Sequence, residues 1–193
     1  DEAGNKITKI SLLTELAKRE INGHSGLEEY LAKIEENTKE LSSGMRDFIW
    51  VLDPAKDSLL DTIHRLKDFG NSMFDYTDTE FTVRGINEKL NNIPLSMDSR
   101  RALMLIFKEA MNNIVKYAKS NNVVLDVTAD DRSISIVLTD DGCGFDHNSI
   151  GNGYGLSNMK ERAAKIGNEL EVTSIQGGGT KVSFTSNITQ MSN

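Results

Sequence analysis

Cysteine is almost absent from this 193-residue sequence, and the single residue, Cys143, excludes an internal disulfide framework and fits a reducing compartment. No apolar run is long enough to span a bilayer, and no signal peptide is recognisable. Basic residues are the minority, 22 against 29 acidic ones, and the net charge of −7 argues against direct, nonspecific binding of nucleic acid. An initiator Met is missing too, so we expect a piece of a longer protein.

What remains is ordinary globular composition, 38% hydrophobic and 26% charged, in a chain long enough for one or two domains with real cores. Apolar residues at helical spacing predict a helix over residues 1–22 and a second over 27–52, which Pro54 ends. The break at 23–26 joins them as a hairpin. Its apolar stripes favour pairing with a second copy, a homodimer with a four-helix bundle; packing on the downstream domain is the alternative.

The rest of the sequence predicts an α+β fold. A third helix over residues 57–76, capped by Asp57 or Ser58, connects the hairpin to the C-terminal part. Short turns between the predicted strands favour a mixed, mostly antiparallel sheet with helices layered on one face. The predicted strands cover residues 81–83, 123–128, 133–139, 170–174 and 181–185, with a helix at 157–166. The polar end, 188–193, is predicted to fray.

Glu109 and Asn113 stand four residues apart on an amphipathic helix whose apolar positions include Ile106, Ala110 and Ile114. The two polar side chains therefore share one face. A carboxylate there can take a proton or orient a nucleophile, and an amide oxygen can ligate Mg²⁺. Taken alone, such a pair is more often a solvated face.

Three glycine-rich loops follow this helix, at residues 139–145, 151–156 and 177–180. Glycine lets the backbone approach a ligand closely, and a glycine loop that opens a helix offers free N–H groups to phosphate. A dinucleotide-binding fingerprint would follow the first strand of a βαβ unit. These glycines come late, after the helix with Glu109 and Asn113, so the pattern is a different one.

These motifs resemble the N, G1, G2 and G3 boxes of the ATP-binding domain of sensor histidine kinases, a fold shared with gyrase B, Hsp90 and MutL. In chain order the matching segments are Glu109-x-x-x-Asn113, Asp140-Asp141-Gly142-x-Gly144, Gly153-Tyr154-Gly155-Leu156 and Gly178-Gly179-Thr180. The resemblance covers residues 78–187. It implies a dimerisation and phosphotransfer hairpin at 1–54, truncated at its start, a connecting helix at 55–77 and an α/β sandwich ATP-binding domain at 78–187.

The resemblance also implies roles for single residues. Asp140 would accept a hydrogen bond from the adenine amino group, with Gly144 giving the base room, and Gly142 would also belong to the nucleotide-binding residues. Asn113 would ligate Mg²⁺ between the phosphates, and Glu109 would act as general base or orient the attacking group. The remaining implied nucleotide-binding residues are Lys116 at a phosphate, Tyr117 where many relatives have His, Gly153, Tyr154, Gly155 and Leu156 in the lid, and Gly178, Gly179 and Thr180 on the opposite side.

The first residues carry a second resemblance, to the segment after the phosphoacceptor in the nitrate-sensor-like kinases, whose pattern is His-Asp-x-x-x-Gln. Asp1 matches the acid and Asn5 replaces the Gln, which leaves phosphatase activity open. The His itself would precede Asp1. The histidines within the chain, at positions 24, 64 and 147, do not fit that role.

The implied function is the cytoplasmic catalytic portion of a two-component sensor histidine kinase, whose parent protein is membrane-anchored through upstream segments. The γ-phosphoryl of Mg-ATP would pass to the His and then to an Asp of a response regulator receiver domain. Two alternatives stay open: an ATPase of the gyrase, Hsp90 and MutL type, and a degenerate nucleotide-binding module. Phosphohistidine, free phosphate or neither as product would separate the three.

Overall fold

The computed structural model describes residues 9–10, 12–14, 16–17, 27–53, 56–146 and 154–192. Asp1, Asn5, Gly153 and most of the predicted first helix lie outside these residues. The chain divides into two compact units, Asp1–Asp53 and Pro54–Asn193. The first contains the helix α2, Leu27–Leu52, with the predicted bounds. Among the described helices, none combines the length and the hydropathy needed to cross a bilayer.

The second unit is built on a five-stranded sheet in the order β1-β2-β3-β5-β4. The edge strand β1 runs parallel to β2, whereas all other neighbours are antiparallel, which confirms the predicted mixed, mostly antiparallel sheet. The strands are β1 (Glu80–Arg84), β2 (Asn122–Ala129), β3 (Ser133–Asp140), β4 (Leu170–Ser174) and β5 (Thr180–Asn187).

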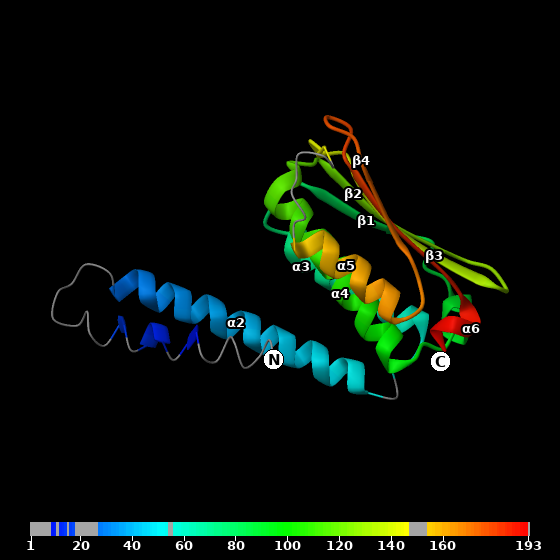
Figure 1. The fold of residues 1–193 in the computed structure, drawn as a ribbon, viewed down its shortest axis with the longest axis horizontal. Coiled ribbons are helices and arrows are strands. Elements are labelled where there is room, and N and C mark those ends of the chain that lie inside the picture. Colours follow the sequence, from blue (N-terminus) through cyan, green and yellow to red (C-terminus); the bar gives the residue numbers. More distant parts are fainter. Residues whose placement is uncertain are drawn as a thin grey trace. The chain divides into compact units, whose positions relative to one another are not determined.

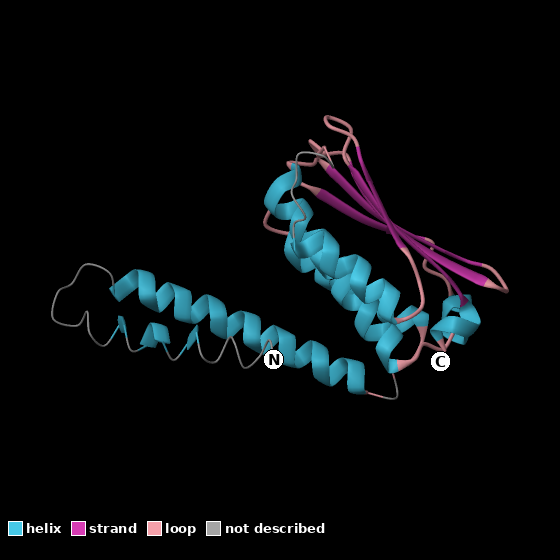
Figure 2. Ribbon diagram, in the orientation of Figure 1, coloured by secondary structure: helices cyan, strands magenta, loops and turns pink. Residues whose placement is uncertain are grey.

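Three helices cover one face of this sheet (Figures 1 and 2): α3 (Leu59–Phe74), α4 (Met97–Asn113) and α5 (Tyr154–Lys165). Alternate strand residues are buried, as Ile134, Ile136 and Leu138 of β3 illustrate. Because successive strand residues point to opposite faces, these side chains share a face with Asp140. The alternation therefore places a carboxylate in line with the apolar core.

The helix α4 begins at an N-cap, Ser96, whose side chain accepts a hydrogen bond from the Ser99 backbone N–H. Its last turn continues as a π-helical segment, η2 (Ile114–Ala118), and the chain leaves it through Lys119 in the left-handed region, φ 51°. Single π turns inside helices occur frequently at functional sites. A short 3-10 helix, η1 (Glu88–Asn92), had no sequence prediction.

Two segments differ from the sequence prediction. The helix predicted to connect the units, α3, packs against α4 and β1 and is an integral layer of the second unit. The end predicted to fray forms a short helix, α6 (Ile188–Met191). Met191 is fully buried, and its carbonyl accepts a 2.7 Å hydrogen bond from the Ser96 N–H. Burial of Met191 and hydrogen bonds to residues distant in the sequence together hold this polar tail, an effect that local polarity does not reveal.

Candidate nucleotide site

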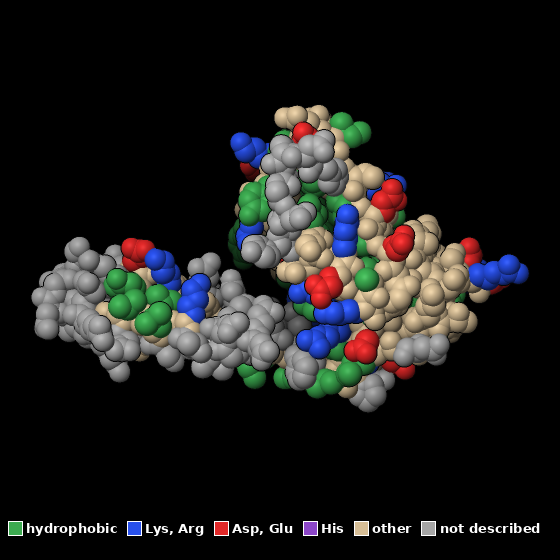
Figure 3. Space-filling view, viewed as in Figure 1, with side chains coloured by type: hydrophobic (Ala, Val, Ile, Leu, Met, Phe, Trp, Pro, Cys, Tyr) green, Lys and Arg blue, Asp and Glu red, His purple; other side chains and the backbone are tan. Residues whose placement is uncertain are grey.

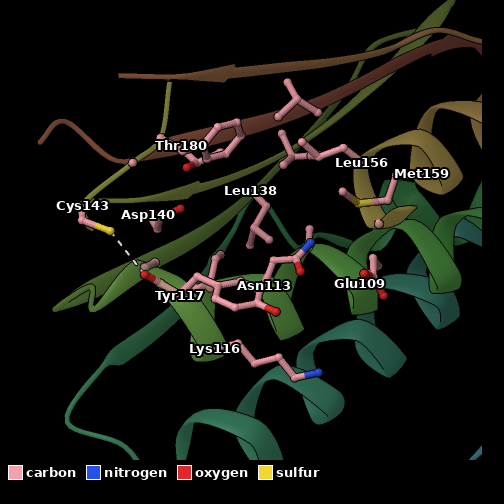
Figure 4. A pocket seen from close by; sticks show the side chains of 18 residues that line it. Glu109, Asn113, Lys116, Tyr117, Leu138, Asp140, Cys143, Leu156, Met159 and Thr180 are labelled. Carbon is pink, nitrogen blue, oxygen red and sulfur yellow. Dashed lines mark hydrogen bonds between the residues drawn. The ribbon is translucent and has the colours of Figure 1, made fainter. Parts of the chain in front are cut away.

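A cavity of about 500 Å³ lies between the helix layer and one end of the sheet (Figure 4). Its wall is mostly apolar with a few polar groups, the usual character of a small-molecule site. The lining residues are Glu109, Ala110, Asn113, Ile114, Lys116, Tyr117, Ala118, Leu138, Asp140, Cys143, Gly144, Phe145, Gly155, Leu156, Met159, Val172, Thr180 and Val182. Nine residues predicted from the motifs are among them.

The helix side of the cavity carries Glu109 and Asn113, one turn apart on α4 (Figure 4). The first turn of α5 lies against this pair. A Cβ placed on Gly155 would stand 2.6 Å from Glu109 Oε1 and 3.6 Å from Asn113 Nδ2. Glycine at position 155 therefore leaves space for the Glu109 and Asn113 side chains to face the cavity.

Asp140, the last residue of β3, supplies the acidic group on the sheet side. Its side chain is buried, and Oδ1 accepts a 2.9 Å hydrogen bond from the Gly142 N–H. Burial raises the pKa of this carboxyl above its ordinary value, while the backbone N–H groups of Gly142 and Thr180 act in the opposite direction. A carboxylate held in apolar surroundings favours a ligand that brings an N–H donor.

The next residue, Asp141, has a different role. Its Oδ1 accepts from the N–H groups of Asn121 and Asn122 at 2.8 and 2.9 Å, and its Oδ2 accepts from Asn122 Nδ2 at 2.7 Å. Hydrogen bonds from the Asn122 side chain and then its backbone lower the pKa of the Asp141 carboxyl. Asp141 thus fastens the start of β2 to the loop after β3.

The other predicted glycines shape the site from behind. A Cβ on Gly142 would meet the Ala118 carbonyl oxygen at 2.3 Å, and one on Gly179 would meet the Asp140 carbonyl oxygen at 2.0 Å. Gly178 packs beside Ile175. These three glycines do not line the cavity, and their lack of a side chain lets neighbouring segments pack closely behind it. Gly144, at φ 57°, lines the cavity itself.

The sequence motifs did not indicate the apolar wall of the cavity. Leu138, Val182 and Val172 lie opposite one another across β3, β5 and β4, and Met159 faces them from α5. The signal was present, because strand alternation puts Leu138 and Asp140 on one face, and the antiparallel register then brings Val182 and Thr180 beside them. Cys143 also lines the cavity, and its Sγ lies 3.2 Å from the Tyr117 carbonyl oxygen.

The described residues hold no group of three or more His, Cys, Asp and Glu side chains that could bind a metal by themselves. At the helix end of the cavity, the side-chain oxygens that could ligate a cation are those of Glu109 and Asn113. On the face in view, acidic and basic side chains are interspersed over the second unit (Figure 3).

The part of the chain that lines this cavity is similar to known proteins. Residues 98–190 match the model of the histidine kinase-, DNA gyrase B-, and HSP90-like ATPase family. The chain is 25% identical over 184 residues to the signal transduction histidine-protein kinase/phosphatase UhpB of Salmonella typhimurium, covering 95% of this chain and 36% of that protein. It is 33% identical over 84 residues to the nitrate/nitrite sensor protein NarX of Escherichia coli, covering 43% of this chain and 14% of that protein.

A third relative, the sensor histidine kinase LiaS of Bacillus subtilis, is 33% identical over 81 residues, 42% of this chain and 22% of that protein. The chain therefore spans about a third or less of the length of these relatives. Among solved structures, the histidine kinase domain of the blue-light activated histidine kinase of Erythrobacter litoralis has the same fold. The TM-score is 0.63 at 16% identity, covering 96% of this chain and 98% of that chain.

Proposed function

Because residues 98–190 match the model of the histidine kinase-, DNA gyrase B-, and HSP90-like ATPase family, we propose that the chain is the catalytic portion of a two-component sensor histidine kinase. The observation that carries the proposal is the meeting of Glu109, Asn113 and Asp140 in one cavity, with Gly155 packed against the first two. Three separate motifs thereby supply one site. ATP is the substrate, and the cavity volume falls within the usual range for a small ligand.

Asp140 would hold the adenine end of ATP. Its ionised form accepts a hydrogen bond from the adenine amino group, and this bond offsets part of the cost of burying the charge. The apolar side chains of Leu138, Met159 and Val182 would enclose the base. The N–H groups of Gly155 and Leu156, at the start of α5, would meet phosphate oxygens.

The helix end of the cavity would hold the triphosphate. Mg²⁺ commonly takes one or two protein oxygens together with substrate phosphates, and the Glu109 and Asn113 oxygens fit that donor set. Asn113 would bind the ion, which would neutralise phosphate charge. Lys116 would contact a phosphate, and Glu109 would orient the attacking group or accept its proton.

The acceptor would be a His directly before Asp1. A neutral imidazole nitrogen bonds to the γ-phosphorus, the bond from that phosphorus to the β,γ-bridging oxygen breaks, and ADP leaves. Asp1 would orient the ring and accept the displaced proton. The phosphoryl group would then pass to an aspartate of a response regulator, and Asn5 would orient the water of the reverse dephosphorylation.

The apolar side chains exposed on α2 would pair with a second copy of the chain. They include Leu31, Met45, Ile49 and Leu52. Upstream segments of the parent protein would anchor it to a membrane, and this catalytic portion would be cytoplasmic.

The test uses the longer protein that contains residues upstream of Asp1, incubated with γ-labelled ATP and Mg²⁺. We expect acid-labile, base-stable label on the protein. Asn113→Ala should abolish this label, whereas Asn112→Ala, one residue away and outside the cavity lining, should retain it. Release of free phosphate without labelled protein would contradict the kinase assignment and favour an ATPase, and bound nucleotide with neither product would favour a degenerate module.

A further inference from the structure

Ser174, the last residue of β4, carries a hydroxyl that joins three segments around the cavity. Its Oγ accepts a 2.8 Å hydrogen bond from the Phe145 N–H. It also lies 3.0 Å from the Gly179 carbonyl oxygen and 3.0 Å from Thr180 Oγ1. Phe145 and Thr180 both line the cavity, whereas Ser174 stands behind them.

The protons and lone pairs that these groups carry fix the direction of the hydrogen bonds. A serine hydroxyl has one proton and two lone pairs. A backbone N–H can only donate and a carbonyl can only accept, so the Ser174 proton goes to the Gly179 oxygen and one lone pair receives the Phe145 N–H. The other lone pair receives the Thr180 proton. The reverse arrangement would leave the Ser174 and Gly179 oxygens 3.0 Å apart without a proton between them.

The direction of these hydrogen bonds decides whether the Thr180 hydroxyl can donate to a ligand or only accept from it. With its proton committed to Ser174, the Thr180 hydroxyl presents only lone pairs to the cavity. Asp140, the register partner of Thr180 on the neighbouring strand, is also an acceptor when ionised (Figure 4). The two side chains are therefore complementary to an amino group and repel a carbonyl oxygen at the same place.

We infer that Ser174 is a positioning residue that determines base specificity, because it fixes the Thr180 hydroxyl as an acceptor. The site would then favour a nucleoside triphosphate whose base carries an exocyclic amino group at this edge over one that carries a carbonyl there. This inference rests on the proposed nucleotide site.

The test is isothermal titration of the full chain with ATP and with GTP. Ser174→Ala frees the Thr180 hydroxyl to turn and donate to a carbonyl. We expect the Kd for ATP to rise about 5-fold, the effect of one hydrogen bond. The preference for ATP over GTP should fall about 10-fold, since binding of the carbonyl base improves at the same time.

Two variants serve as controls. Ser174→Thr keeps the hydroxyl and should keep both affinities within about 2-fold, an effect of a few tenths of a kcal/mol. Ser183→Ala removes a hydroxyl from β5 on the opposite face of the sheet and should do the same. If Ser174→Ala weakens both nucleotides by one factor, the residue is merely structural and the inference is overturned while the proposed site stands.

Thr180→Val provides a second route if Ser174→Ala does not fold. It removes the same acceptor at nearly constant shape, and we expect a similar fall in the preference for ATP. An unchanged preference in this variant overturns the inference. If the unaltered chain binds neither nucleotide, both the inference and the proposed site fail.

Discussion

At the scale of single residues, the site depends on how closely the backbone approaches the side chains as much as on which chemical groups line the cavity. Gly155 contributes no side chain, yet a Cβ there would overlap the Glu109 carboxylate. The atom in the way is the end of a flexible side chain, so the carboxylate can move aside without disturbing the fold. Stability and catalysis should therefore separate at this position.

Gly155→Ala tests that separation. Alanine is the better helix former, so the free energy of unfolding should stay constant or rise by up to about 1 kcal/mol. The displaced Glu109 carboxylate should lower the rate of protein labelling at least about 10-fold, a typical loss for a misplaced acid–base group. The rate of labelling of the longer protein by γ-labelled ATP measures the effect on catalysis, and urea unfolding measures the effect on stability. Ser157→Ala, an exposed change on the same helix, should alter neither, and a fully active Gly155→Ala variant would refute the role of this contact.

The lowered pKa of Asp141 predicts that the stability of the fold depends on pH. Its pKa is lower in the folded than in the unfolded state, so its contribution to stability is present above the unfolded value of about 3.9 and is lost as pH falls through the lowered folded value. Urea unfolding should therefore find Asp141→Ala less stable than the unaltered chain at pH 7, with the difference shrinking below about pH 4. Asp131→Ala, in an exposed turn, is the matched control. A difference that persists unchanged at low pH would contradict the assigned hydrogen bonds.

At the scale of elements, local rules account for most boundaries. The sequence offered Asp57 or Ser58 as the cap of α3, and the structure selects Ser58, whose Oγ accepts from the Asp61 N–H at 3.1 Å and donates to Asp61 Oδ2 at 2.7 Å. The same segment is tied to the strand-like residues before α4, since the Leu59 N–H donates to the Ile93 carbonyl at 2.8 Å. The cap therefore lies beside a long-range contact that ties the start of α3 to the segment before α4.

Ser58→Ala should lower the free energy of unfolding by about 1 kcal/mol, the usual cost of losing an N-cap, and by up to about 2 because the side chain is buried. Urea denaturation of the chain gives the value. Ser72→Ala, on the exposed surface of the same helix, is expected to change it by less than about 0.5 kcal/mol. Equal stability of Ser58→Ala and the unaltered chain would rule out the cap.

The polar half of the site was predicted from the resemblance of the motifs to a known family. Periodicity and turns could predict the strands and the antiparallel pairing, because these follow from local patterns. They could not predict α6, whose Met191 is held by packing, or the π-helical turn at residues 114–118. They also missed Val172 and Val182, which reach the cavity only through strand register. Asp1 and Asn5 remain predictions, since both lie outside the described residues.

At the scale of the whole molecule, residues 54–193 form a compact unit with its own core, and the described residues that line the cavity all belong to it. This unit, produced without residues 1–53, should fold cooperatively and bind ATP within about 3-fold of the full chain, as expected for an independent domain. Thermal unfolding and titration with ATP measure both properties. Loss of nucleotide binding on removal of residues 1–53 would show that the site depends on the helical unit.

If Glu109, Asn113 and Asp140 line one ATP site, as we propose, the most direct measurement is isothermal titration calorimetry of the chain with ATP. Asp140→Asn is the informative variant, because its oxygen can still accept from the Gly142 N–H while its amide donors face the adenine amino group. We expect the unaltered chain to bind and Asp140→Asn to bind at least about 10-fold more weakly, the effect of losing a charged hydrogen bond. Asp126→Asn, on the opposite face of β2, should bind normally. Equal affinity of Asp140→Asn and the unaltered chain, or no binding by the latter, would contradict the claim.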